Sequence, residues 1–287
     1  MSLPAVALVM AALCNNPVQT ADGVRGAYFR KIISKTDSRY YGIRGRGFLP
    51  KVEIGRWTSE RIALDRPAVF MGGTGGHREL DAGLTWDRVH DASGRPTFTD
   101  SPDGCDGGDP KRRFVRGGDS LHPQLIDGSG VVVAQGFEVA PRILMKLRPN
   151  FAFRPYWRTT NAGENKWKNP DLGPGDAYFY PGRAFAMEVR IVGPGVMALA
   201  IEGDGVRFET SFAQDGFMAG PGQKGSAFKR NNEIDQLVEE GDELKGMEGR
   251  DVLRTTTRVL GARWDEVSLL VQGSAPIPLA GSNCVEV

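Results

Sequence analysis

Short runs of alternating apolar and polar residues, separated by turn-forming residues, dominate this sequence. The clearest run covers residues 183–192 and places four apolar side chains at the same parity: Phe185, Met187, Val189 and Ile191. Because residues i and i+2 of a strand point to the same side, the run predicts a β-strand with one buried face.

Turn residues follow this run and separate it from two similar ones. Residues 193–195 read Gly-Pro-Gly and precede an apolar run at 196–202, and residues 203–205 read Gly-Asp-Gly and precede an alternating run from Val206 to Ser211. This order predicts an antiparallel meander of three strands. Further strands are expected at 27–33, 47–54, 68–71, 80–86, 131–139, 143–147, 177–180, 254–259 and 266–271.

Helical periodicity is almost absent. The best segment, Asn232–Met247, is acidic and has few spaced apolar residues, so it predicts at most one short surface helix. The sequence shows no alternation of strands and helices, so a doubly wound nucleotide-binding fold is disfavoured. The expected fold is mainly β: an antiparallel two-sheet β-sandwich, with residues 1–287 as a single domain. Its long loops, 100–123 and 159–176, are positions where binding residues tend to lie.

Charge and composition exclude several classes of protein. The 287 residues contain 36 Lys plus Arg against 35 Asp plus Glu, so no overall positive field favours nucleic acid or an anionic membrane. The apolar run Leu3–Leu13 is too short to span a bilayer and lacks the basic residues that begin a secretory signal. A core element is the favoured reading of this run, and a truncated export signal is the alternative.

Cysteine and histidine are too few for a dense disulfide framework or a multi-histidine metal centre. Three cysteines include no CxxC pair, and the three histidines are widely spaced. A single disulfide between Cys14 and Cys284 stays open beside the reading as free thiols.

Aromatic residues gather in one stretch that is also rich in Arg and Asn. Sugar rings stack their apolar faces on such side chains, while amides and guanidinium groups hold the hydroxyls. The sequence therefore predicts a groove for a polysaccharide or other glycan; the alternative is that these rings pack the core. The predicted groove residues are Trp157, Trp167, Tyr178 and Tyr180.

Paired carboxyl groups are candidates for acid–base chemistry. Cleavage of a glycosidic bond requires one carboxyl that donates a proton and a second that attacks or activates water. Glu79 with Asp81, and Glu233 with Asp235, have the i, i+2 spacing that places both side chains on one face of a strand. Solvated acidic turns are the alternative reading of both pairs.

The second pair resembles a motif of the family-16 glycoside hydrolases. That family carries Glu-x-Asp-x-Glu or Glu-x-Asp-x-x-Glu on a strand of a concanavalin-like, jelly-roll sandwich. Glu233 and Asp235 match the first positions, whereas Glu239 lies one residue beyond the longer spacing. The resemblance implies a lectin- or glucanase-like sandwich and, by analogy of fold, an extracellular or cell-surface location.

Two glycine-rich segments are further candidates. Gly72–Gly76 precedes His77 and Arg78, which are expected to contact a ligand at the end of a strand; a hairpin tip is the alternative. The acidic loop at 103–109 offers oxygen ligands of the kind that calcium prefers, so calcium is the one cofactor considered; an exposed turn is the alternative. The candidate calcium ligands are Asp103, Asp106 and Asp109.

Three functions follow from these patterns, in order of preference. The first is a carbohydrate-binding or surface-interaction protein without a complete catalytic motif. The second is a glycoside hydrolase or polysaccharide lyase that uses the paired carboxyls. The third is a structural component of an envelope or assembly. The sequence does not determine the ligand or the oligomeric state.

Overall fold

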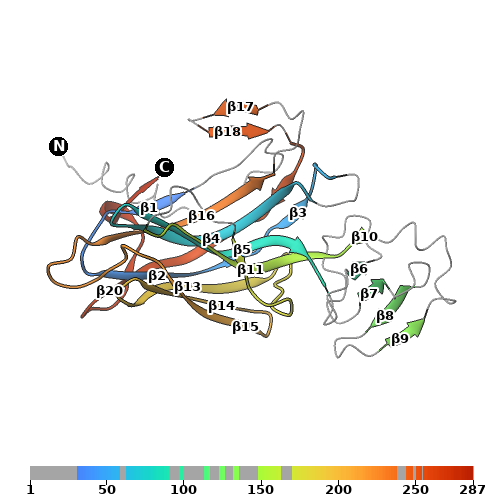
Figure 1. Cartoon of the computed structure of the whole chain (residues 1–287), viewed down its shortest axis with the longest axis horizontal. Coiled ribbons are helices and arrows are strands. Elements are labelled where there is room, and N and C mark those ends of the chain that lie inside the picture. The colour runs from blue at the N-terminus through green and yellow to red at the C-terminus, as the bar shows by residue number, and fades with distance from the viewer. Residues whose placement is uncertain are drawn as a thin grey trace, which may run out of the picture.

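The described part of the chain is an antiparallel β-sandwich, which confirms the expected fold class. The computed structural model describes residues 31–58, 63–90, 97–99, 113–116, 123–126, 132–135, 148–162, 170–237, 244–247, 250–253 and 255–286. Two large sheets form two layers (Figure 1). The described residues include no α-helix, only a three-residue 3-10 turn, η2 (Gly281–Asn283).

Sheet A has seven strands in the order β12-β11-β5-β4-β16-β1-β22. Its four central strands are long and pair in register through neighbouring antiparallel ladders. The strands are β12 (Asp171–Leu172), β11 (Phe151–Thr159), β5 (Arg78–Arg88), β4 (Asp65–Gly75), β16 (Ser226–Gln236), β1 (Ile32–Ser34) and β22 (Cys284–Glu286).

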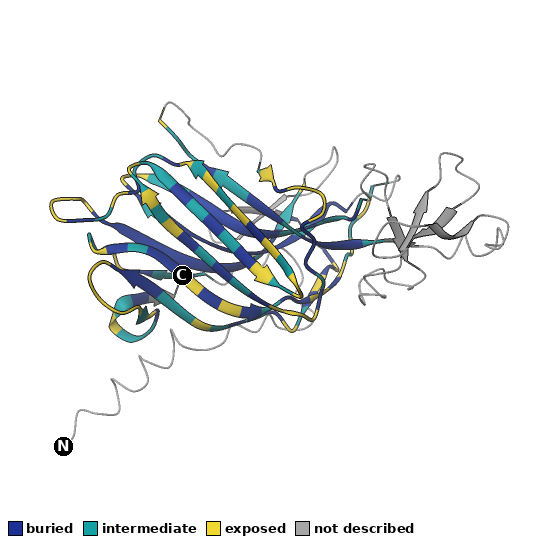
Figure 2. Ribbon diagram, turned by 90° about the horizontal axis from the view of Figure 1, so that it is seen from below, coloured by how far each residue is buried: buried dark blue, intermediate teal, exposed yellow. Residues whose placement is uncertain are grey.

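Sheet B has six strands in the order β15-β14-β13-β2-β20-β21. The meander that the sequence predicts is confirmed as β13, β14 and β15, and along β13 and β14 buried residues alternate with partly or fully exposed ones (Figure 2). The strands are β2 (Tyr40–Phe48), β13 (Ala184–Gly193), β14 (Val196–Gly203), β15 (Val206–Ala213), β20 (Arg263–Val271) and β21 (Ile277–Pro278).

Smaller sheets complete the topology. Five short strands between β5 and β11 pair in the order β10-β6-β7-β8-β9, and two further pairs are β17–β18 and β3–β19. Their bounds are β6 (Thr97–Thr99), β7 (Arg113–Arg116), β8 (Pro123–Ile126), β9 (Val132–Gln135), β10 (Arg148–Pro149), β17 (Leu244–Met247), β18 (Arg250–Leu253), β3 (Lys51–Glu53) and β19 (Arg258–Leu260).

The structure specifies two segments further than the sequence does. The segment Asn232–Met247, for which the sequence allows at most one short helix, has no helix among its described residues, because its first residues continue β16 through Gln236 and residues 244–247 form β17. Most of the glycine series 72–76 lies inside β4 rather than in a loop. The turn to β5 comes afterwards, at Gly76 and His77, which both have positive φ.

The hydrophobic core lies between sheets A and B. Sheet A contributes alternate residues of β4 and β5, such as Met71 and Leu84, and sheet B contributes residues such as Val189 and Leu199. Since successive side chains of a strand point to opposite faces, the intervening residues of β4 and β5 lie on the other side of sheet A. We call that side the outer face of sheet A.

The described residues carry two further facts that bear on function. Cys284 on β22 is disulfide-bonded, whereas Cys14 and Cys105 lie outside the described residues. In the described part of the chain, no helix has the length and apolar character needed to cross a membrane.

Candidate functional site

Polar and charged side chains gather on the outer face of sheet A. Strand register places Asp81 of β5 beside Gly72 of β4, and Gly72 beside Lys229 of β16. Ala68 of β4 lies opposite Glu233 in the same way. Small residues on β4 thus leave room for the longer side chains of the neighbouring strands, which converge over the middle of the sheet.

Glu233 is the most unusual group on this face. Its pKa is raised from the ordinary value of a glutamic acid to about 8, chiefly because desolvation of this partly buried carboxyl disfavours its charged form, and also because Asp81 and Asp235 repel that form. Lys229 and Arg158 act in the opposite direction and do not cancel these effects. Asn231 donates a hydrogen bond from Nδ2 to Oε2 of Glu233 at 3.2 Å. Glu233 is therefore a protonated acid near neutral pH.

Lys229 and Asp81 form a buried ion pair beside this acid. Their side chains are only 7% and 10% exposed, and Nζ of Lys229 lies 2.7 Å from Oδ1 of Asp81. Burial by itself lowers the pKa of Lys229, but the Asp81 carboxylate outweighs burial and the pKa is raised. Lys229 also lies over the ring of Phe70, with 5.7 Å between Nζ and the ring centroid. The lysine is thereby held as a cation.

Arg158 and Tyr156 of β11 complete the group. Nη2 of Arg158 donates a hydrogen bond to Oδ2 of Asp235 at 3.1 Å, so the second carboxyl of the pair on β16 is also matched with a cation. Tyr156 is buried, and its pKa is raised well above the ordinary value by burial and by the charges of Glu233 and Asp81. Its ring meets Phe70 edge to face, at 6.2 Å between centroids.

A pocket of about 240 Å³ opens beside Glu233. Arg66, Asp235 and the exposed Leu172 line it, together with Tyr156 and Arg158. A larger groove of about 510 Å³ lies over Arg46 and Glu266 of sheet B, but those side chains are 74% and 77% exposed. We place the candidate site at the smaller pocket because it contains the partly buried carboxyl whose pKa is raised.

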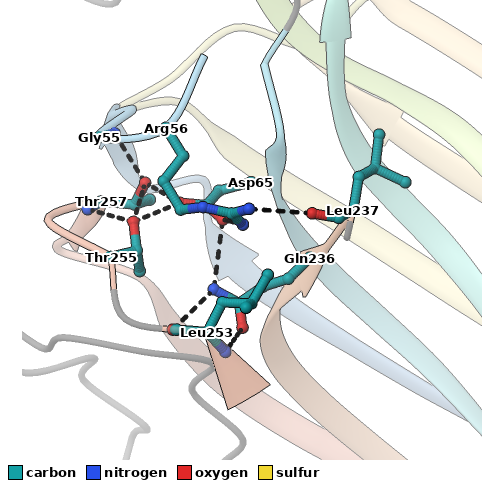
Figure 3. A network of polar contacts seen from close by, with 8 residues as sticks. All are labelled: Gly55, Arg56, Asp65, Gln236, Leu237, Leu253, Thr255 and Thr257. Atoms are coloured by element: carbon teal, nitrogen blue, oxygen red, sulfur yellow. Dashed lines mark hydrogen bonds and ion pairs between the residues drawn. The ribbon is translucent and has the colours of Figure 1, made fainter. Parts of the chain in front are cut away.

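A network of polar contacts fixes the end of β4 and β16 next to this pocket (Figure 3). Asp65, which is fully buried, accepts a hydrogen bond from Arg56 at 3.0 Å and others from the hydroxyls of Thr255 and Thr257. Gln236 bonds to Asp65 and to the backbone of Leu253. These contacts hold the strand ends on which Arg66 and Asp235 lie.

The structure brings together three of the four carboxyls that the sequence singled out. Asp81, Glu233 and Asp235 interact across three strands of the outer face. Glu79 has the same parity on β5, closer to the hairpin, and its charge acts on Lys229. His77 and Arg78 lie at the turn and at the first residue of β5.

Among the aromatic residues expected to line a groove, Trp157, Tyr178 and Tyr180 do not line the pocket beside Glu233. Trp157 packs toward sheet B, where its ring stacks on Phe208 and Phe212 at 6.3 and 5.5 Å between centroids. Tyr178 is buried, and its hydroxyl bonds to the backbone of Arg88 and His90. Tyr180 packs beside Tyr178 in a small cluster. Trp167 lies outside the described residues.

The proposed calcium ligands lie outside the described residues as well: Asp103, Asp106 and Asp109. Within the described residues, no group of three His, Cys, Asp or Glu side chains is placed to hold a metal ion. The groups that the structure places at the site are carboxyl, ammonium, guanidinium and phenol groups.

Sequence reasoning missed Lys229, Asn231, Tyr156 and Arg158 as members of the site. A signal was present in β16, where Lys229, Asn231, Glu233 and Asp235 share one parity. It was hidden because the opposite parity also holds polar residues. One of them, Asn232, accepts a hydrogen bond from Trp264 of sheet B at 3.1 Å.

Comparison with known proteins gives similarity of architecture only. No protein-family model matches the sequence, and no curated protein matches it. Among solved structures, the chain is similar to SCP-B, a peptidase of the eqolisin family in complex with a tripeptide, with a TM-score of 0.43 and 10% identity over 92% of this chain and 88% of that chain.

Two other similar structures are polysaccharide- or phage-related. The enzymatically active domain of tailspike protein 2 of bacteriophage CBA120 gives a TM-score of 0.34 and 11% identity, over 90% of this chain and 28% of that chain. A complex of alginate lyase Aly36B with alginate trisaccharide gives a TM-score of 0.22 and 11% identity, over 87% of this chain and 73% of that chain. TM-scores this low assign neither an activity nor a concanavalin-like superfamily to the chain.

Proposed function

We propose that this protein hydrolyses glycosidic bonds of a polysaccharide at the outer face of sheet A, with Glu233 as the proton donor. The observation that carries the proposal is the contrast between carboxyls at one pocket. Glu233 is protonated near neutral pH, whereas Asp235 is hydrogen-bonded to a guanidinium. Hydrolysis of a glycosidic bond needs one protonated and one ionised carboxyl.

The roles follow from the surroundings of each group. Glu233 donates its proton to the leaving oxygen, and Asp235, which lines the same pocket, is the carboxylate that attacks or activates water. Asp81 does not line this pocket; its charge helps to keep Glu233 protonated, while Lys229 balances it. Asp81 and Lys229 are positioning residues in this scheme.

Lyase chemistry is less well supported by the same face. A lyase needs a base that removes a proton from the sugar ring, and the basic candidates are Lys229 and Tyr156. The pKa of Lys229 is raised by Asp81, and the pKa of Tyr156 is raised by burial, so neither group is a free base near neutral pH.

The test is incubation of the full chain with β-glucans, galactans and uronate polymers. We expect new reducing ends without the absorbance of unsaturated products, and loss of at least about 100-fold in rate for Glu233→Gln. Glu202→Gln, on the exposed side of sheet B, is the matched control. Full activity of Glu233→Gln, unsaturated products, or Glu233-dependent cleavage of denatured protein instead of glycans would each contradict the proposal.

Carbohydrate binding without turnover is the second candidate. The observation in its favour is that Ala68 and Tyr156, two members of an apolar cluster on the outer face, line the pocket together with charged groups, a combination that suits a sugar ring and its hydroxyls. Calorimetry that detects binding of a glycan which the wild-type protein never cleaves would favour this candidate over the hydrolase.

A further inference from the structure

Arg66 is a guanidinium that the proposed chemistry does not use. It lies on β4, directly opposite Asp235 of β16, and it lines the pocket beside Glu233. Its side chain is partly exposed to solvent. In the part of the chain that the structure describes, no hydrogen bond or ion pair engages it. Its cross-strand neighbour Asp235 is instead bonded to Arg158.

The charges around the pocket leave Arg66 unbalanced. Asp87 lies 3.2 Å from Nη1 of Arg154, and Asp235 lies 3.1 Å from Nη2 of Arg158, so each of these carboxylates has its own cation. Glu233 is uncharged below pH about 8. Among the described residues that line the pocket, Arg66 therefore carries the positive charge that no carboxylate matches.

We infer that Arg66 binds the carboxylate of a uronic-acid unit, so that the substrate is an acidic polysaccharide. The claim that the acidic polysaccharide is cleaved rests on the proposed function, whereas the claim that Arg66 binds a uronate carboxylate does not. A guanidinium matches the planar geometry of a carboxylate and binds it through two parallel hydrogen bonds. Arg66 is two residues along β4 from Ala68, which lies opposite Glu233, so the bound unit would sit next to the proton donor.

The test measures binding of matched oligosaccharides to the full chain by calorimetry. The probes are oligomers of galacturonate, mannuronate and guluronate, each paired with its carboxyl-reduced counterpart of the same linkage and length. Binding is measured in the Glu233→Gln background, so that turnover does not interfere. We expect at least one uronate oligomer to bind about tenfold or more tightly than its reduced counterpart, with affinity that falls as salt is added.

Arg66 variants then locate the source of this preference. Arg66→Gln should remove the preference for the carboxylated oligomer and leave affinity for the reduced oligomer unchanged. Arg66→Lys should restore part of it, because charge is kept and the paired hydrogen bonds are lost. Arg46→Gln, on the exposed face of sheet B, is the control and should change neither affinity.

Several outcomes would overturn the inference. These are equal affinity for both members of every pair, no binding of any pair, a preference that survives in Arg66→Gln, or an Arg66-dependent preference for a sulfated galactan over all uronates. If neutral glycans are cleaved in a Glu233-dependent way and Arg66→Gln has no selective effect, the proposed function stands and this inference fails. If uronate binding depends on Arg66 but no glycan is cleaved, this inference stands and the proposed function fails.

Discussion

At the scale of residues, the site depends on how three carboxyls and two cations share a confined space. Asp81 and Asp235 each have a cationic partner, whereas among the described residues the one hydrogen-bond donor to Glu233 is the amide of Asn231. Burial disfavours a charge without a matched counter-charge, so the proton resides on Glu233. The same logic predicts how substitutions at these positions change stability.

Removal of the ammonium group of Lys229 should be costly. Lys229→Met leaves the Asp81 carboxylate buried without its cation, and loss of one partner of a buried ion pair typically costs about 3–5 kcal/mol. Urea unfolding measures the difference. The control is the double variant Asp81→Asn with Lys229→Met, which should recover a large part of the lost free energy; a single variant as stable as wild type would contradict this account of the pair.

The raised pKa of Glu233 predicts how stability changes with pH. In the unfolded chain Glu233 ionises near pH 4.5, whereas in the folded chain it keeps its proton up to about pH 8. The folded state thus binds more protons between these values, so this group's contribution to stability is fully present below pH 4.5 and is lost as pH rises through 8.

Glu233→Gln removes this titration. Relative to wild type, the variant should gain in melting temperature when the pH is raised from 5 to 9, because wild type alone must hold a buried charge at the higher pH. Thermal unfolding at pH 5, 7 and 9 measures the change, with Glu202→Gln as the control. A difference between variant and wild type that does not change with pH would show that Glu233 is ionised throughout.

At the scale of elements, the middle of β4 makes the floor of the site. Gly72 and Gly73 have strands on both sides, and a Cβ at these positions would lie 1.9 Å from the carbonyl oxygen of Leu80 and 2.1 Å from that of Ala227. The glycines are needed because β5 and β16 approach β4 so closely here, which also brings Asp81 and Lys229 together across it.

Gly72→Ala should therefore disrupt sheet A. The added methyl group meets backbone atoms, which cannot rotate away, and we expect a loss of at least about 3 kcal/mol in the free energy of unfolding. Gly193→Ala in β13 is the matched control, because a Cβ there has no atom within 4 Å, and it should change stability by less than about 0.5 kcal/mol. Equal urea midpoints for the two variants would refute the close approach at Gly72.

The same elements show what can be predicted from sequence. Alternation predicted β13 and β15, in which one parity is mainly apolar and the other mainly polar, and an apolar run between two glycine turns predicted β14. It failed for β16, where Arg230 and Asn232 share the parity of Phe228, and for Gly72–Gly75, because glycine has no side chain to mark a strand. The i, i+2 spacing predicted that both carboxyls of a pair lie on one face of a strand, as they do in β5 and β16. No local pattern indicates that β5 and β16 are both neighbours of β4.

At the scale of the whole molecule, packing between the sheets separates core aromatics from the site. Trp157 is one residue from Tyr156, yet it stacks on Phe208 and Phe212 of sheet B, while Tyr156 lies on the outer face of sheet A. The aromatic stretch in the sequence is thus divided between two faces of one strand. Some of its rings pack in the core between the sheets, and others lie on the outer face.

Trp157→Ala tests this division. Loss of the ring should leave a cavity between the sheets and lower the free energy of unfolding by about 3 kcal/mol, and Trp157→Phe should recover part of this because it keeps an aromatic contact. Glycan affinity, measured well below the unfolding temperature, should stay the same. Reduced affinity without reduced stability would place Trp157 at the ligand instead.

The most direct test of the central claim is a titration of Glu233 itself. Carbon-13 NMR of the protein labelled at the side-chain carboxyls of glutamate follows the carboxyl resonances from pH 4 to 10, with Glu233→Gln for assignment. The account predicts one glutamate resonance that titrates near pH 8 and is missing from the variant. If every glutamate titrates below about pH 6, Glu233 is ionised at neutral pH and is not the proton donor of this site.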